Sequence, residues 1–334
     1  MTTEITILLK DKAITASDGA VTINNNKTWY GVKKTFTLSK NPPMNIMING
    51  SPTINNFPLT LLIHEFEKIS KSTNIEDMTE EFLEYIGKTV PKTDVKNFIY
   101  DKIDEFKNIY GKISKSEYIE YIEELSKIDI EIPEFIGNNY DLMFEEIIPN
   151  NISEKQKNKL KLSLKKIFIQ YLITFSTGIV ITGVNISNHF PSYIAFNILL
   201  NNNGKIEIIN KKSEINCNKT IFEVFGQTDV IDAYLTGIDE TFENKIIHLI
   251  EIIIKPSKLE SNLLKSEIKR LKNTHKRNML KNIESLPPND LCDLMENLIK
   301  STEIKKKLMS DIDNVGGDIC INEITKYHGI QEKR

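Results

Sequence analysis

The sequence is poor in cysteine: its 334 residues include only Cys217, Cys292 and Cys320. Three widely separated cysteines exclude a disulfide scaffold and a paired-cysteine zinc site, and they favour a reducing compartment. An excess of one charge is also absent, since 43 Lys and Arg stand against 46 Asp and Glu, a net charge of −3. That balance does not indicate a nucleic-acid or membrane binder. We therefore expect a folded cytoplasmic protein.

Motifs that bind cofactors are missing as well. The sequence has no phosphate-binding loop, no dinucleotide-binding glycine fingerprint and no HExxH zinc motif. Its five histidines fall in no motif that suggests a catalytic triad. Residues 311–316 begin like a calcium-binding loop, but Val315 stands where an oxygen ligand is needed. We expect no cofactor, no metal and no ATPase activity in this chain.

One uncharged run tests the expectation of a cytoplasmic protein. Residues 167–186 are long enough to cross a bilayer. Polar residues interrupt this run, and after Gly178 it becomes rich in β-branched residues, which is typical of a strand. The first ten residues include Glu4 and are too short for the apolar part of a signal peptide. We interpret 167–186 as a helix that leads into a buried strand, and we expect no membrane span.

The small net charge conceals two segments of opposite sign. Residues 71–150 contain nine Lys and nineteen Asp and Glu, a net charge of −10, and show helical periodicity. Residues 255–281 contain nine Lys and Arg and two Glu, a net charge of +7, and also have a helical pattern. Such segments are usually solvated helix faces. They can also face one another or a neighbouring subunit.

The rest of the chain alternates between strand and helix patterns. The sequence predicts strands, several of them joined as hairpins by turn residues, at 3–10, 13–17, 34–39, 44–48, 178–185, 190–199, 205–210 and 319–324. It predicts helices at about 58–71, 154–175, 227–237, 243–254 and 289–309. This order indicates an α+β domain with antiparallel sheets in layers.

Thr2 is the first residue with catalytic potential. A small side chain at this position permits removal of Met1, which would make Thr2 the N-terminal residue. Its hydroxyl is a nucleophile, and the free α-amine beside it can accept the hydroxyl proton near neutral pH. No histidine is then needed as the base.

Three further residues complete a candidate site. A hairpin over residues 3–17 returns the chain to its start, so Asp18 is expected near Thr2. Lys34 begins the next strand, and its positive charge would lower the pKa of the nucleophile. Asp18 would orient Lys34. Gly50 follows a strand, and its backbone N–H can serve as an oxyanion-hole donor.

The spacing of these residues resembles that of a known family. The segments TTEITILL, SDGAVT, GVKKTFTL and INGSP are similar to the start of the proteasome β-subunit and HslV family of N-terminal nucleophile (Ntn) hydrolases. The helix FPLTLLIHEFEKI looks like the first helix of that family. The resemblance covers about residues 2–70, 150–255 and 285–330, close to uncharacterised bacterial proteasome-like proteins.

Weaker similarity continues downstream. The segment FGQTD resembles the turn in which the family places a supporting serine, and Gln227 or Thr228 would take that role. The segment VGGDICINEI resembles a glycine-containing loop that an aspartate and a serine flank in the family. Val315 replaces that serine, and Asp313 stands near the aspartate position.

The resemblance implies a fold and a function. It implies a four-layer αββα Ntn-hydrolase sandwich of two antiparallel sheets, formed by one domain over 1–334 with an acidic helical insertion at 71–150 and a basic one at 255–284. It also implies a threonine peptidase or amidohydrolase that cleaves peptide or protein substrates, assembles into a ring-like homo-oligomer and works with a separate ATPase unfoldase.

Two other functions remain open. One is an inactive interaction or scaffold protein of the same fold that works through its charged insertions. The other is nucleic-acid binding by the basic helix at 255–281, for which the overall charge gives no support.

Overall fold

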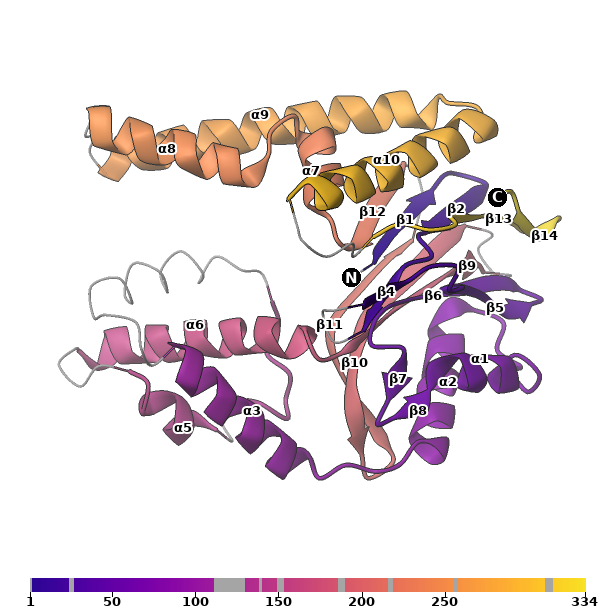
Figure 1. Ribbon diagram of the computed structural model, residues 1–334, viewed down its shortest axis with the longest axis horizontal. Helices are drawn as coiled ribbons and strands as arrows, with labels where there is room; N and C mark the ends of the chain where they lie inside the picture. Colours follow the sequence, from indigo (N-terminus) through magenta and orange to yellow (C-terminus); the bar gives the residue numbers. More distant parts are fainter. Residues whose placement is uncertain are drawn as a thin grey trace.

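The computed structural model describes residues 2–23, 27–110, 130–137, 140–148, 153–185, 190–215, 219–254, 258–309 and 315–334. Two five-stranded sheets form the centre of the molecule (Figure 1). The first sheet has the order β12 (Ile221–Gly226), β1 (Thr3–Leu8), β2 (Lys12–Ser17), β13 (Cys320–Thr325), β14 (Gly329–Glu332). The second has the order β11 (Lys205–Ile215), β10 (Pro191–Asn202), β9 (Thr177–Val184), β6 (Pro43–Gly50), β5 (Thr35–Lys40). All neighbouring strands of both sheets are antiparallel.

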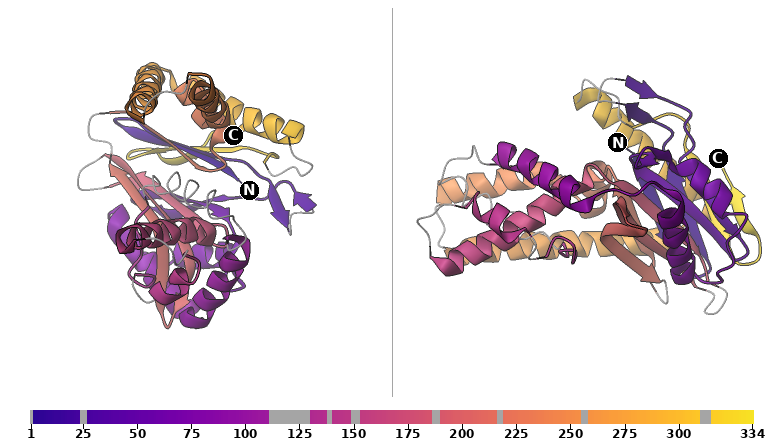
Figure 2. Two further views of the ribbon diagram at one scale, coloured as in Figure 1. Left: turned by 90° about the vertical axis from the view of Figure 1, so that its left-hand side faces the viewer. Right: turned by 90° about the horizontal axis from the view of Figure 1, so that it is seen from below.

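Helices cover the outer face of each sheet. Helices α1 (Leu59–Phe66) and α2 (Ile75–Thr89) share a buried apolar cluster with β5, β6, β9 and β10. Helices α7 (Asp229–Thr236) and α10 (Pro288–Met309), with the end of α9 (Lys258–Glu284), pack on the first sheet. The order of layers is therefore helix, sheet, sheet, helix, as Figure 2 shows from two further sides.

Strand β1 shows why the two faces of a sheet differ. Side chains alternate along a strand, so Ile5 and Ile7 share one face and Glu4 and Thr6 share the other. The two isoleucines belong to the apolar cluster under α7 and α10. Glu4 and Thr6 face the second sheet, and Leu8 follows them into the apolar cluster between the sheets. All five side chains are fully buried, so this strand has a polar inner face within the sandwich.

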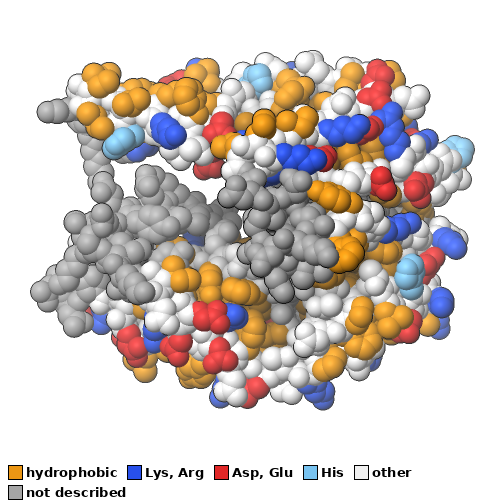
Figure 3. All heavy atoms as spheres, viewed as in Figure 1, with side chains coloured by type: hydrophobic (Ala, Val, Ile, Leu, Met, Phe, Trp, Pro, Cys, Tyr) orange, Lys and Arg blue, Asp and Glu red, His pale blue; other side chains and the backbone are white. Residues whose placement is uncertain are grey.

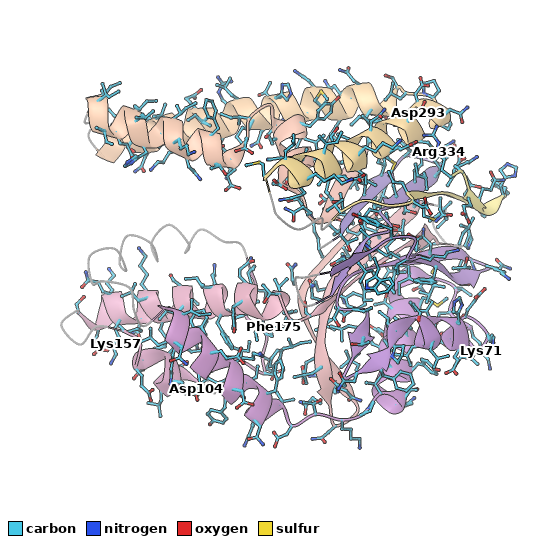
Figure 4. The ribbon with its side chains drawn as sticks, viewed as in Figure 1. Lys71, Asp104, Lys157, Phe175, Asp293 and Arg334 are labelled. Atoms are coloured by element: carbon cyan, nitrogen blue, oxygen red, sulfur yellow. The ribbon has the colours of Figure 1, made fainter. Side chains whose placement is uncertain are left out.

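Two groups of helices extend from the same side of the sandwich (Figure 1). One is the pair α8 (Glu240–Ile254) and α9. The other comprises α3 (Val95–Tyr110), α5 (Asp141–Glu145) and α6 (Glu154–Ile173), which share an apolar cluster of their own. In Figure 4, Phe175 lies at the end of α6, where the Lys102 ammonium is 3.9 Å from its ring centroid. That contact joins α3 to the segment after α6.

The chain ends on the first sheet. The two-stranded pairs β3 (Val21–Ile23) with β4 (Lys27–Trp29), and β7 (Thr53–Ile54) with β8 (Phe57–Pro58), are short additions elsewhere. After β14, the carbonyl O of Arg334 accepts a hydrogen bond of 3.0 Å from Ile321 N–H. The Arg334 side chain pairs with Asp293 and Glu296 on α10, and Figure 4 shows Arg334 beside Asp293. The C-terminal segment thus ties β13 to a covering helix.

The predicted α+β class with a four-layer αββα sandwich of antiparallel sheets is confirmed. Within the run 167–186, a helix ends at Ile173 and β9 follows from Thr177 to Val184. No described helix is long and apolar enough to cross a membrane. The helix predicted at 58–71 is shorter, since α1 ends at Phe66. Strands β12 and β14 were not predicted.

The division into one domain with two insertions stays a prediction, but the structure adds detail to it. Helix α2 falls within the segment 71–150, and its residues Ile75, Met78, Phe82 and Ile86 pack in the cluster on the second sheet. The first helix of the acidic segment is therefore part of the covering layer. The basic segment forms most of α9, whose 27 residues reach well beyond the sheets.

Gly87 on α2 provides a test of this packing. A Cβ at Gly87 would lie 2.1 Å from the carbonyl O of Gly204, in the β10–β11 turn. Gly to Ala normally stabilises a helix by about 1 kcal/mol. Here the methyl group would collide with backbone, so we expect Gly87→Ala to lower the free energy of unfolding by about 1–3 kcal/mol. Urea denaturation measures this.

The exposed neighbour Lys88 is the matched control. Lys88→Ala removes only a surface side chain and should change the unfolding free energy by less than about 0.5 kcal/mol. A Gly87→Ala protein as stable as Lys88→Ala would contradict the close packing of α2 on the turn.

Candidate functional site

Thr2 stands directly before β1, held by the end of β12. Thr2 is buried, with 6% of the residue exposed. Its carbonyl O accepts a hydrogen bond of 2.7 Å from Gln227 N–H. Gly226 has φ +75°, and a Cβ there would lie 2.1 Å from the same carbonyl O. Glycine is therefore required for this approach, which fixes the start of β1.

Lys34 reaches Thr2 from the second sheet. It lies immediately before β5, and its Nζ donates hydrogen bonds to Thr2 Oγ1 at 2.7 Å and to Asp18 Oδ1 at 3.0 Å. The Lys34 side chain is only 5% exposed. The structure thus brings the predicted nucleophile, lysine and aspartate into one hydrogen-bonded group.

Asp18 follows β2 and has its carboxylate surrounded by donors. Oδ1 accepts from the backbone N–H of Thr3 at 3.0 Å, as well as from Lys34. Oδ2 accepts from the N–H groups of Ala20 at 3.2 Å and Gly316 at 3.1 Å. Four hydrogen bonds fix the orientation of this fully buried side chain. Asp18 therefore holds Lys34 in position from a rigid base.

Burial changes the acid–base properties of Lys34. Loss of water around the ammonium lowers the pKa of Lys34, while the negative charge and hydrogen bond of Asp18 act in the opposite direction. The net shift is downward. Lys34 is therefore a better proton donor to the Thr2 oxygen than a lysine in water.

Glu4 is a functional candidate that sequence reasoning missed. Its side chain is fully buried, and Oε2 accepts a hydrogen bond of 2.9 Å from Asn49 Nδ2. Burial raises the pKa of Glu4 to about 8, although the bond from Asn49 and the charge of Lys34 lower it. Glu4 is therefore mainly protonated at pH 7. The only signal in the sequence was that Glu4 is the one charged residue in the segment 2–8.

Gly50 ends β6, and the strand geometry shows where its N–H points. Backbone N–H groups alternate between the two neighbouring strands of an antiparallel sheet. Ser51 N–H bonds to Ser176 O beside β9, whereas Ile48 N–H bonds to Lys34 O on the opposite side. Gly50 N–H therefore points to the same side as Ile48 N–H, toward the chain that contains Lys34. The role of Gly50 N–H as an oxyanion-hole donor stays a prediction.

The supporting candidates have different positions. Gln227 contacts Thr2 through its backbone, while its side-chain Nε2 donates to Asp229 Oδ1 at 2.8 Å. Thr228 is the N-cap residue of α7, and its side chain makes no capping hydrogen bond. Asp313 lies outside the described residues. The structure thus brings Gln227 next to Thr2 by its main chain alone.

Two cavities adjoin this region. One of about 220 Å³ lies beside Asp18 and Lys34 and is also lined by Cys320. A larger one of about 870 Å³ lies among α7, α8, α9 and α10, and Thr228 is among its lining residues. Among the described residues, no group of three His, Cys, Asp or Glu could hold a metal ion.

Comparisons with known proteins give similarity only in structure. No protein-family model and no curated protein matches the sequence. The solved structure of the Gly-1 mutant of Anbu from Hyphomicrobium sp. strain MC1 is 10% identical, with a TM-score of 0.42, over 100% of this chain and 87% of that chain. Anbu from the same strain in another structure is 9% identical, with a TM-score of 0.34, over 99% and 85%. At this level the comparisons assign no activity to the chain.

Substitutions at Asp18 and Lys34 should affect stability unequally. Asp18→Ala leaves the buried Lys34 ammonium without its carboxylate, and the N–H groups of Thr3, Ala20 and Gly316 without an acceptor. We expect a loss of about 3–5 kcal/mol in unfolding free energy. Lys34→Met should cost less, because Asp18 keeps its three backbone donors. Denaturant titration of both variants measures the difference, and equal losses would contradict the role of Asp18.

Glu4 should make stability depend on pH. The native state retains the Glu4 proton up to about pH 8, whereas the unfolded chain releases it near pH 4.5. The unfolded state therefore binds fewer protons in this window, and stability falls as pH rises through it, by up to about 1.4 kcal/mol per pH unit. Glu4→Gln has no such proton, so the wild type should lose stability relative to Glu4→Gln from pH 4.5 to 8.

Glu323 is the control of opposite sign. Burial raises the pKa of this carboxyl, but the hydrogen bonds and charges of Lys333 and Lys12 outweigh it, so the net shift of the pKa is downward. Its stabilising contribution is present above its ordinary pKa and is lost as pH falls through the native value. Relative to Glu323→Gln, the wild type should thus lose stability as the pH falls.

A stability difference between wild type and Glu4→Gln that does not change with pH would contradict the buried, protonated state of Glu4.

Proposed function

We propose that this chain is an N-terminal threonine hydrolase that cleaves amide bonds, with Thr2 as the nucleophile after removal of Met1. The observation that carries the proposal is the hydrogen bond of 2.7 Å from Lys34 Nζ to Thr2 Oγ1, with Asp18 bonded to the same ammonium at 3.0 Å. A buried lysine with a lowered pKa, aimed at a hydroxyl, is an arrangement that activates a nucleophile.

The proposed reaction has two steps. Thr2 Oγ attacks the amide carbonyl carbon, and the Thr2 α-amine accepts the hydroxyl proton. Lys34 stabilises the developing negative charge on Oγ, and the Gly50 N–H donates to the oxyanion formed from the carbonyl oxygen. The C–N bond then breaks as the leaving amine takes up the proton, which gives an ester on Thr2. Water attacks this ester, releases the carboxylic acid and restores Thr2.

Peptides or proteins are the proposed substrates. In the proposed reaction, Thr2 and the Gly50 N–H act only on the amide group of the substrate. Any peptide bond that reaches Thr2 can therefore be cleaved. A peptidase on this scaffold would act as a ring-like homo-oligomer, with a separate ATPase as unfoldase. These partners follow from the sequence resemblance and belong to the proposal. Gln227 would then support Thr2 through the backbone contact at 2.7 Å.

The alternative is an interaction protein on the same scaffold. One observation favours it: α8 has no buried residue, and Phe242, Leu249, Ile252 and Ile253 on this helix are each more than half exposed. Apolar side chains are visible along the α8–α9 pair in Figure 3. Exposed apolar faces of this kind serve as interaction surfaces. Catalysis and such a surface can also coexist in one chain.

Covalent labelling tests the catalytic proposal. A β-lactone acylates a nucleophilic N-terminal threonine, so the wild type should gain one adduct on Thr2 by intact mass and peptide mapping. Thr2→Ala removes the hydroxyl and should abolish the adduct. Lys34→Ala removes the charge that stabilises the oxygen and should slow acylation by a factor of about 10² or more.

Lys12 offers a matched control, because it is another partly buried lysine in an ion pair, with Glu323. Lys12→Ala should leave the acylation rate within a factor of about two. Mass measurement of the N-terminus is required first, since retained Met1 removes the proposed base. A processed protein that β-lactone does not modify at Thr2 would favour the interaction protein instead.

A further inference from the structure

A hydrogen bond between the two sheets lies next to both proposed reacting groups. Glu4 on β1 and Asn49 on β6 are joined by the bond of 2.9 Å from Nδ2 to Oε2. Glu4 is two residues after Thr2, and because side chains alternate, both face the second sheet. Asn49 immediately precedes Gly50. The bond therefore links the strand of the nucleophile to the strand of the oxyanion donor.

The surroundings of Asn49 are shaped for this contact. Asn49 pairs with Gly178 on β9. A Cβ at Gly178 would lie 2.0 Å from Asn49 Oδ1, so the absence of a side chain there provides the space in which the amide lies. The carboxyl group of Glu4 is fully enclosed, and its other oxygen, Oε1, has no hydrogen-bond partner among the described residues. Glu4 is thus held at one point, by Asn49.

We propose that Glu4 and Asn49 are positioning residues that set the separation between Thr2 Oγ and the Gly50 N–H. This inference rests on the proposed function, because it concerns the geometry of that site. Thr2 and Gly50 belong to different sheets, and Lys34 fixes Thr2 only with respect to β5. The Glu4–Asn49 bond adds the constraint along β6. A displacement of about 1 Å between reacting groups is enough to slow an enzyme strongly.

The chain contains a matched control for this bond. Asn45, four residues earlier on the same inner face of β6, donates to Thr15 Oγ1 on β2 at 2.6 Å. Both asparagines make one bond from Nδ2 to the first sheet; Asn45 is buried and Asn49 is partly buried. Only Asn49 adjoins Gly50. Asn45→Ala and Asn49→Ala should therefore destabilise the protein to a similar degree, while only Asn49→Ala disturbs the site.

Two probes separate a positioning effect from general damage. A β-lactone forms an oxyanion at the attacked carbonyl, whereas a vinyl sulfone reacts with Thr2 by addition to a carbon–carbon double bond and forms no such oxyanion. Rates of modification by both are measured by intact mass on the full chain with Met1 removed. For Asn49→Ala and Glu4→Ala, we expect acylation by β-lactone to fall 10- to 100-fold and modification by vinyl sulfone to change less than threefold.

Two further variants complete the design. Glu4→Gln keeps an acceptor oxygen for Asn49, and since Glu4 is mainly protonated at pH 7, it should restore β-lactone acylation to within about fivefold of the wild type. The double variant Glu4→Ala/Asn49→Ala should be no slower than the slower single variant, because both lose the same bond.

The outcomes are distinguishable. If wild type is not acylated at Thr2, the proposed function fails. If wild type is acylated but Asn49→Ala and Asn45→Ala react equally with β-lactone, the proposed function stands and the inference fails. The inference also fails if Asn49→Ala slows both probes to the same extent, since the bond would then act on Thr2 alone.

Discussion

The structure around the candidate site depends on the carboxylate of Asp18. One oxygen joins β1, through Thr3 N–H, to Lys34 from the second sheet, and the other binds the N–H groups of Ala20 and Gly316. Three separate parts of the chain, at Thr3, Lys34 and Gly316, therefore converge on one buried group. Because an unpaired buried charge is costly, the Lys34 ammonium requires the Asp18 carboxylate. This pair also fixes the position of Thr2, because the Lys34 ammonium donates a second hydrogen bond to the Thr2 hydroxyl.

A buried cation between two acids gives the site its electrostatic character. Burial lowers the pKa of Lys34 and raises the pKa of Glu4 to about 8, so burial disfavours the charged form of both groups. Asp18 has enough donors to compensate its burial, whereas Glu4 has one, from Asn49. The two acids thus have different roles in the proposal: Asp18 orients Lys34, and Glu4 connects the two sheets in protonated form.

Part of this arrangement was predictable from the sequence. Alternating and continuous apolar runs predicted most strands of both sheets, and a hairpin that returns the chain to its start predicted Asp18 near Thr2. Strand β12 was missed because Glu223 interrupts the apolar run IFEVFG, and Gly226 at the end of this run is typical of a turn. Glu4 and Asn49 were missed because their contact crosses between sheets, and no local pattern determines which residues face each other there.

By itself, the sequence determined the α+β class, the antiparallel hairpins and the candidate group of Thr2, Asp18, Lys34 and Gly50, because each depends on residues near one another in the chain or on a regular spacing. Tertiary structure decided the rest. Packing of the two sheets brought Lys34 Nζ to 2.7 Å from Thr2 Oγ1 and paired Glu4 with Asn49. It also placed α2 in the covering layer of the sandwich. These contacts depend on how the sheets and helices pack, which is a property of the whole chain rather than of any segment.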